Sequence, residues 1–162
     1  CIWNLPVVFV CENNGYAEAT PVQYHCAVKN ISDRGVAYDM PAVTVDGTDF
    51  FAVYEAAEEA IGKARRGEGP SLVECRAFRY YGHYQGDATL YFTEEEKSRN
   101  RANDPIPKLR EKLLKRRLLS ETELTEIEAK VADEIQEAVK FAEESPLPEP
   151  HEVLTDVYVK YP

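Results

Sequence analysis

The sequence has little positive charge and no long hydrophobic run. Of its 162 residues, 19 are Lys or Arg and 29 are Asp or Glu, which gives a formal net charge of −10. Binding to nucleic acid is driven mostly by lysine and arginine, so this balance argues against a nucleic-acid partner. No apolar run approaches the roughly 18 residues of a membrane span. The chain also opens without the basic leader and apolar core of a signal peptide. We therefore expect no membrane partner.

Several patterns that carry chemistry in other proteins are also missing. The four cysteines stand at positions 1, 11, 26 and 75 and form no C-x-x-C pair, so the sequence offers neither a zinc cage nor a thioredoxin-like motif. It contains no glycine-rich phosphate loop and no defensible Ser-His-Asp or Cys-His arrangement. Buried free thiols in a reducing compartment are the simpler interpretation of these cysteines. We therefore expect a cytoplasmic protein.

The first half of the chain alternates strand and helix patterns. A valine-rich apolar run at 5–11 predicts a strand that is buried on both faces, as parallel strands are. Residues 41–45 and 71–78 predict two further strands, and 49–66 predicts a helix between them. A short helix could lie within 24–39. The order strand, helix, strand is typical of an α/β fold with a parallel sheet.

The second half of the chain is predicted to be helical. A T-x-x-E pattern at 93–96 and an S-x-x-E pattern at 120–123 match the capping box that opens many helices. Another helix is expected to begin at Asp104. We therefore expect a partial α/β core over residues 1–92 and a C-terminal helical region of the same domain over residues 93–162.

The first predicted strand ends in an acid, two amides and a glycine, E-N-N-G at 12–15. In parallel sheets, ligands bind beyond the carboxyl ends of strands, where this segment lies. Asn14 can offer a side-chain oxygen and Tyr16 a backbone carbonyl oxygen to a hard cation such as Mg²⁺, which takes about six oxygen ligands. These neutral oxygens cannot be the whole site, because a carboxylate is missing. A plain turn is the alternative interpretation of the same residues.

His83 stands in an aromatic loop, R-Y-Y-G-H-Y-Q-G-D at 79–87, after the third predicted strand. Histidine exchanges its proton near neutral pH, so this side chain could act as a general acid or base. Gly82 would let a ligand approach the backbone closely. The alternative is an ordinary loop histidine packed among tyrosines. His25 and His151 have no partners at useful spacing, and we assign them no role.

These stretches together resemble the α subunit of the thiamin diphosphate-dependent E1 component of 2-oxo acid dehydrogenase complexes, a family that includes pyruvate, branched-chain and acetoin dehydrogenases. The resemblance rests on L-P-V-V-F-V-C-E-N-N-G-Y, on V-D-G-x-D and G-E-G-P-x-L-x-E further along, and on the G-H loop. It runs from about Leu5 to Val153. It implies an oxidoreductase with a parallel-sheet thiamin-diphosphate-binding fold, whose N-terminal half is missing from this chain and which carries a C-terminal helical appendage.

The resemblance also implies roles for individual residues in a cofactor site. Asn14 would bind Mg²⁺ through its side chain and Tyr16 through its carbonyl, and the metal would anchor the diphosphate of thiamin diphosphate. His83 would reach the active site, contact the bound cofactor, and help with proton transfer and intermediate stabilisation. The stretch 80–92 would be a flexible loop that orders over the cofactor and contacts the lipoyl partner. Tyr84 replaces the regulatory serine of mitochondrial pyruvate enzymes, so that phosphorylation switch would be absent.

Partners and substrate follow from the same resemblance. It implies an α2β2 assembly with an E1 β subunit, a lipoyl E2 component, and a 2-oxo acid or acetoin as substrate. G-H-Y-Q-G-D looks closer to the acetoin type than to the pyruvate type. The family's G-D-G motif, whose aspartate is the missing carboxylate, would precede this chain, so we expect the chain alone to be inactive. The alternative is a non-catalytic fragment or assembly module that has lost the cofactor site.

Overall fold

The computed structural model describes residues 1–155, which belong to two compact units. The first unit spans Cys1–Leu113, and the second begins at Leu114. The sheet and the predicted site residues lie in the first unit. Within the described residues, no helix is both long enough and apolar enough to span a membrane. The division expected at residue 92 stays a prediction.

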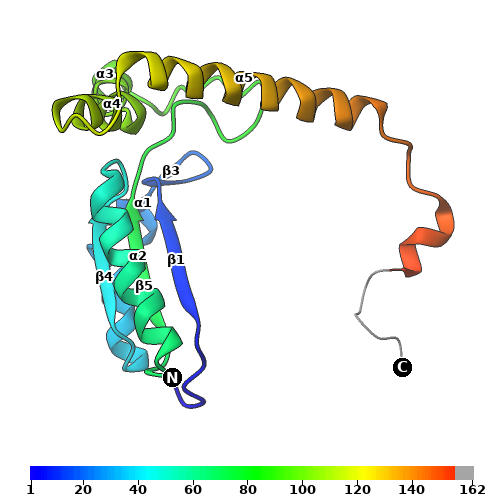
Figure 1. Ribbon diagram of the computed structural model, residues 1–162. Helices are drawn as coiled ribbons and strands as arrows, with labels where there is room; N and C mark the ends of the chain where they lie inside the picture. Colours follow the sequence, from blue (N-terminus) through cyan, green and yellow to red (C-terminus); the bar gives the residue numbers. More distant parts are fainter. Residues whose placement is uncertain (156–162) are drawn as a thin grey trace. The chain divides into compact units, whose positions relative to one another are not determined.

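The first unit is built on a parallel three-stranded sheet with the order β1-β5-β4 (Figure 1). Its strands are β1 (Val8–Asn13), β4 (Ala42–Asp46) and β5 (Ser71–Arg76). Both outer strands pair with the central β5, and the ends Asn13 and Asp46 both lie opposite Arg76. All three strands therefore end at the same edge of the sheet. The mixed α/β fold with a parallel sheet is confirmed.

Helix α2, Phe50–Arg65, connects β4 to β5 and lies over one face of the sheet (Figure 1). It begins at Asp49, whose side chain accepts a hydrogen bond from the N–H of Phe51 at 3.1 Å. The small core between helix and sheet consists of Ala60, Val73 and Cys75, with Val8, Val45, Val53 and Ala56 packed against it. Cys75 is a free thiol, and so are the other three cysteines.

Strand β1 differs from its prediction in both position and burial. It begins at Val8 and continues through Glu12 and Asn13, which still pair with β5. The prediction of burial on both faces is wrong, because Phe9 is 50% and Val10 62% exposed, and successive residues of a strand point to opposite faces of the sheet. The strand that is buried on both faces is β5, which has a neighbour on each side.

Short elements fill the segment between β1 and β4. They are β2 (Tyr16–Ala17), β3 (Thr20–Pro21), α1 (Val22–His25) and the 3-10 helix η1 (Ile31–Tyr38). The first two pair as a small antiparallel hairpin directly after the bend that ends β1. The helix expected within 24–39 is therefore present mainly as a 3-10 helix.

The predicted capping boxes open the helices of the second half. The helices are α3 (Glu94–Ala102), α4 (Pro105–Lys115), α5 (Glu121–Glu144) and the 3-10 helix η2 (Pro150–Leu154). The Thr93 hydroxyl accepts from the N–H of Glu96 at 3.1 Å, and the Ser120 hydroxyl accepts from the N–H of Glu123 at 3.3 Å. In both boxes the glutamate carboxylate accepts in return from the capping residue's N–H. At α4, Asp104 accepts from the N–H of Ile106.

Gly47 closes the turn between β4 and α2 where the chain passes close to β5. Its N–H donates to the carbonyl oxygen of Arg76 at 2.8 Å, and a Cβ atom at this position would lie 2.7 Å from that same oxygen. The oxygen belongs to the strand backbone and cannot move by itself. At Gly62 in α2, by contrast, a Cβ atom would meet only the end of the flexible Arg66 side chain, at 3.1 Å.

We expect Gly47→Ala to lower the free energy of unfolding by about 1–3 kcal/mol, because the added methyl group overpacks the turn. The matched control Gly62→Ala should leave stability unchanged or raise it by up to about 1 kcal/mol, since alanine is favoured over glycine in a helix. Urea unfolding of both variants beside the wild type measures the difference. Equal stability of the two variants would contradict the close approach at Gly47.

Candidate functional site

A cavity of about 360 Å³ opens where the three strands end. The carboxyl edge of a parallel sheet is where α/β proteins bind ligands. Residues from the ends of β1, β4 and β5 and from α3 line the cavity, among them Asn14, Tyr16, Asp46, Thr48, Arg76 and Arg99. The structure therefore brings both predicted metal ligands to one cavity at the expected edge.

The bend after β1 is held by the side chains of two successive asparagines. The side-chain oxygen of Asn13 accepts from the N–H of Gly15, and that of Asn14 accepts from the N–H of Tyr16, both at 3.1 Å. Gly15 adopts a φ of +83°, which favours glycine. The turn interpretation is therefore correct for the local geometry. It does not exclude a metal, because an amide oxygen that accepts one hydrogen bond keeps a second lone pair.

Glu74 of β5 lies behind this bend and has 0% of its surface exposed. Its carboxylate accepts hydrogen bonds from Asn13 Nδ2 at 2.7 Å, from the N–H of Ser32 at 2.8 Å and from the Thr44 hydroxyl at 3.1 Å. Burial by itself would raise the pKa of Glu74, but these hydrogen bonds and one from the N–H of Ile31 outweigh it and lower the pKa to about 2. The carboxylate is thus charged at neutral pH, and it joins β1, η1 and β4 to β5.

The side chain of Tyr16 packs against the end of the loop that follows β5. Its ring centroid lies 5.5 Å from that of Tyr91 and 5.0 Å from that of Phe92. The guanidinium carbon of Arg79 lies 5.5, 5.8 and 5.7 Å from the centroids of these three rings in turn. Such cation–π contacts stabilise the cluster, and the Tyr16 hydroxyl also donates to Glu96 at 2.9 Å. The bend after β1 is therefore attached to the loop.

The loop itself is organised by Asp87. The carboxylate accepts hydrogen bonds from the N–H of His83 at 2.8 Å, the N–H of Thr89 at 2.9 Å and the hydroxyl of Tyr91 at 2.6 Å. These bonds, with that from Tyr91 the strongest, lower the pKa of Asp87. A single side chain thus fixes the backbone on both sides of the loop's glycine-containing tip.

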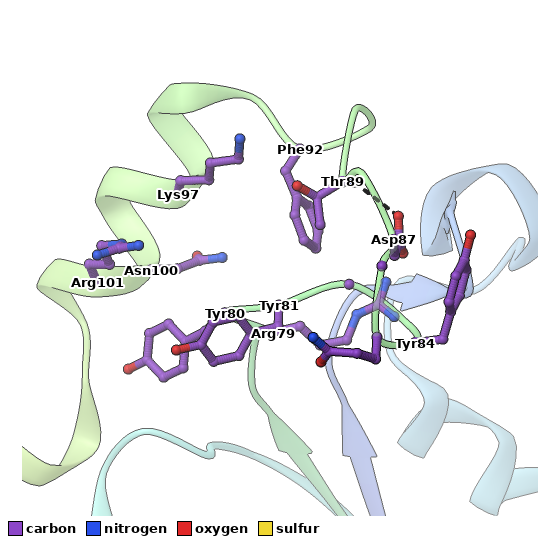
Figure 2. A pocket seen from close by; sticks show the side chains of 13 residues that line it. Arg79, Tyr80, Tyr81, Tyr84, Asp87, Thr89, Phe92, Lys97, Asn100 and Arg101 are labelled. Carbon is purple, nitrogen blue, oxygen red and sulfur yellow. Dashed lines mark hydrogen bonds between the residues drawn. The ribbon is translucent and has the colours of Figure 1, made fainter.

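The loop encloses a second cavity, of about 400 Å³ (Figure 2). Tyrosines of the loop lie along one side, and Lys97, Asn100 and Arg101 of α3 line another. Gly82 and Tyr84, the two neighbours of His83, belong to its wall, whereas the His83 side chain is exposed.

The predicted site residues thus fall into two groups. Asn14 and Tyr16 share the cavity at the sheet edge, while His83 lies on the loop beside the second cavity. The contact of Tyr16 with Tyr91 and the hydrogen bond from Tyr91 to Asp87 connect the two groups. The roles of Asn14, Tyr16 and His83 as metal, cofactor and catalytic residues stay predictions.

Three contributors to this region were missed in the sequence. An acid in the middle of a buried strand, as Glu74 is, signals a hydrogen-bonded partner, because buried carboxylates are seldom unpaired. The spacing of Asp87 and Thr89 is typical of an Asx turn. The rings around Arg79 combine two from the end of its own loop with Tyr16 from a distant part of the chain, an arrangement that no local pattern signals.

The residues present fit part of a magnesium site. Asn14 and Tyr16 offer oxygens of the kind that Mg²⁺ prefers, and the nearby Arg76 and Arg99 give the cavity wall positive charge that suits a phosphate group. The carboxylate of Asp46 on the same wall accepts hydrogen bonds from the N–H and hydroxyl of Thr48 at 2.9 and 2.7 Å. Within residues 1–155, no group of three or more His, Cys, Asp or Glu side chains is arranged to hold a metal ion.

The chain matches a known protein family along most of its length. Residues 1–151 match the family described as dehydrogenase E1 component. The α subunit of acetoin:2,6-dichlorophenolindophenol oxidoreductase from Bacillus subtilis is 53% identical over 161 residues, which cover 99% of this chain and 48% of that protein. The chloroplastic pyruvate dehydrogenase E1 component subunit alpha-3 from Oryza sativa is 43% identical over 157 residues, 97% of this chain and 37% of that protein.

A more distant relative extends the same pattern. The pyruvate dehydrogenase E1 component subunit alpha from Rickettsia felis is 34% identical over 157 residues, which are 97% of this chain and 48% of that protein. The chain therefore spans about half, or less, of the length of these curated relatives.

We expect the buried charge of Glu74 to make the free energy of unfolding depend on pH. Its pKa is about 2 in the folded chain and about 4.3 in an unfolded one, so the charge contributes roughly 3 kcal/mol near neutral pH. That contribution is present above the unfolded pKa and disappears as the pH falls toward 2. Because Glu74→Gln cannot titrate, its stability difference from the wild type should shrink by this amount between pH 6 and pH 2 in urea unfolding. A difference that stays constant with pH would contradict the hydrogen-bonded charge.

Proposed function

The chain belongs to the dehydrogenase E1 component family, and we propose that it forms the C-terminal part of the α subunit of a thiamin diphosphate-dependent E1 enzyme. The enzyme is an oxidoreductase that cleaves a 2-oxo acid or acetoin and transfers the acyl group to the lipoyl group of an E2 component. The observation that carries the proposal is the bend at Asn14 and Tyr16, which faces a cavity at the carboxyl edge of the sheet.

The proposed fold is one part of a larger thiamin-diphosphate-binding sheet, with α3, α4 and α5 as its C-terminal helical region. The Bacillus subtilis relative carries about as many residues again as this chain, since the chain covers 48% of it. The exposed Phe9 and Val10 of the edge strand β1 suit a strand that gains cover from the rest of the subunit. We expect the remaining half to supply the aspartate ligand, so that this chain alone is inactive.

In the complete site, Mg²⁺ would be held by the side-chain oxygen of Asn14 and the carbonyl oxygen of Tyr16, together with that aspartate. The metal would anchor the diphosphate of the cofactor in the cavity, whose wall carries Arg76 and Arg99. Two oxygens offered from positions two residues apart in one hydrogen-bonded bend can bind without first becoming ordered, which favours affinity.

The loop after β5 would supply the protonating side chain. Thiamin diphosphate, when bound, provides the carbanion chemistry that breaks the carbon–carbon bond beside the substrate carbonyl. His83 would donate or remove a proton at the substrate carbonyl oxygen. Asp87 fixes the backbone N–H of His83, so it would determine how the loop presents the imidazole. The loop 80–92 would order over the cofactor and contact the lipoyl partner.

The partners would be an E1 β subunit, in an α2β2 heterotetramer, and the lipoyl E2 component. Identity is higher to the acetoin relatives, at 53% and 49%, than to the pyruvate relative from Oryza sativa, at 43%. This difference supports acetoin as the first substrate to assay, followed by pyruvate and branched-chain 2-oxo acids.

We expect Asn14→Ala in the full-length α subunit, assembled with β, to raise the dissociation constant for Mg²⁺ at least about tenfold, because loss of even a supporting group has an effect of that size. Asn103→Ala is the matched control, since Asn103 lines the same cavity without a proposed ligand role. Calorimetric titration with Mg²⁺ in the presence of thiamin diphosphate measures both. Unchanged affinity in Asn14→Ala would remove Asn14 from the metal site.

We expect His83→Ala in the same assembly to lower kcat about 10²–10⁴-fold, the range for loss of a general acid or base, while folding stays intact. The control is His25→Ala, which removes an exposed histidine with no assigned role. Steady-state kinetics with acetoin and then with the 2-oxo acids separate kcat from KM. Wild-type turnover in His83→Ala with every accepted substrate would exclude His83 from the reaction.

A further inference from the structure

We propose that Glu74 is a positioning residue for the metal-binding bend, and that it acts through Asn13 to fix the direction in which Asn14 and Tyr16 present their oxygens. The inference rests on the proposed role of these two residues as magnesium ligands. Glu74 cannot touch a ligand itself, because none of its surface is exposed. Apart from the attraction of its charge through space, any influence on the metal must therefore pass through the residues that hydrogen-bond to it.

The side-chain amide of Asn13 links Glu74 to the bend. Its Nδ2 donates to Glu74 Oε1 at 2.7 Å, and its Oδ1 accepts from the N–H of Gly15 at 3.1 Å. A carboxylate can only accept hydrogen bonds, so Glu74 requires the NH2 group of Asn13 to point inward. The Asn13 oxygen is then left facing Gly15. The acid thereby determines which end of the amide holds the bend.

The other carboxylate oxygen of Glu74 is fixed to the sheet and to η1. Glu74 Oε2 accepts from the N–H of Ser32 at 2.8 Å and from the Thr44 hydroxyl at 3.1 Å. The Ser32 and Thr44 hydroxyls are themselves hydrogen-bonded at 2.6 Å. The N–H of Ser32 belongs to the backbone of η1, so this shorter bond by itself holds Oε2 in place and fixes the position that the carboxylate gives to Asn13.

The tip of the bend depends on these hydrogen bonds because it has little packing of its own. A Cβ atom built at Gly15 would find no other atom within 4 Å. Glycine also has the widest choice of backbone conformations. Gly15 therefore keeps its φ of +83° through hydrogen bonds: those made by the Asn13 and Asn14 side chains, and the bond that its carbonyl oxygen accepts from the N–H of Val22 at 2.8 Å.

The donor and acceptor atoms of the side-chain amides predict the effect of Glu74→Gln. The new side chain can keep an oxygen toward Ser32 and Thr44, but it then presents an NH2 group to the NH2 group of Asn13. Asn13 would turn over to accept that hydrogen bond, and its own NH2 group would then face the N–H of Gly15. With the bond to Gly15 lost, we expect the dissociation constant for the metal to rise about tenfold, as when a group supporting a ligand is removed.

Exchanging the acid and the amide should restore the bend. In Glu74→Gln/Asn13→Asp, one oxygen of the new aspartate accepts from the glutamine NH2 group, and the other accepts from the N–H of Gly15. The pair carries the same net charge as in the wild type. We expect metal affinity to return to within about threefold of the wild type, which corresponds to a large coupling between the two positions.

Thr44→Val is the matched control for loss of stability alone. It removes a hydrogen bond to the same carboxylate but leaves the bond between Glu74 and Asn13 in place. We expect this variant to unfold at a lower urea concentration and to bind metal with unchanged affinity. All variants are made in the full-length α subunit with its β partner. Electron paramagnetic resonance of Mn²⁺, titrated in the presence of thiamin diphosphate, measures the affinity without an activity assay.

The outcomes distinguish the inference from the function on which it rests. We call the effect of Glu74 on the metal-binding bend through Asn13 the relay. Weaker metal binding in Glu74→Gln, recovery in the exchanged pair and unchanged binding in Thr44→Val support it. If Glu74→Gln does not assemble, recovery of affinity in the exchanged pair still supports it. Failure of the exchanged pair to recover, or equal weakening in Thr44→Val, overturns it. Wild-type affinity in Glu74→Gln together with weak binding in Asn14→Ala overturns the relay alone, whereas wild-type affinity in Asn14→Ala overturns the metal site and the relay together.

Discussion

The buried carboxylate of Glu74 is the constraint on which the functional edge of the sheet depends. An unpaired charge in a protein interior is very unfavourable, so each group that donates to this carboxylate must stay in place. The donors belong to Asn13 in β1, Ser32 in η1 and Thr44 in β4. The need to satisfy one charge therefore fixes the relative positions of the strand ends from which the candidate site is built.

Tyr16 is the residue that the two parts of the candidate site share. Its backbone belongs to the bend at the sheet edge, and its ring packs with Tyr91 and Phe92 around Arg79. Through Tyr91 the cluster reaches Asp87, which holds the loop that carries His83. A residue assigned from sequence only for its carbonyl oxygen thus has a second structural function through its side chain. In the proposed enzyme, the backbone of Tyr16 would bind the metal, and its side chain would help to order the loop.

The features predicted correctly from sequence are those set by local patterns. Apolar spacing and turn residues located β4, α2 and β5, and reciprocal capping residues such as Thr93 located the helix starts. The burial of β1 was predicted wrongly, because burial of a strand's faces depends on what packs over the sheet rather than on the strand's own residues. Glu74 accepts a hydrogen bond from Ser32, which is 42 residues away in the sequence, and Arg79 donates one to the carbonyl oxygen of Glu18, 61 residues away. Such contacts are beyond the reach of any local pattern.

The central claim is that the bend after β1 holds a divalent ion by means of Asn14 and Tyr16. The most direct test is anomalous diffraction from crystals of the full-length α subunit assembled with β, grown with thiamin diphosphate and Mn²⁺. The account predicts an anomalous peak within bonding distance, about 2.0–2.2 Å, of both the Asn14 side-chain oxygen and the Tyr16 carbonyl oxygen. A manganese peak bound elsewhere, with this bend in contact with neither metal nor diphosphate, would contradict it.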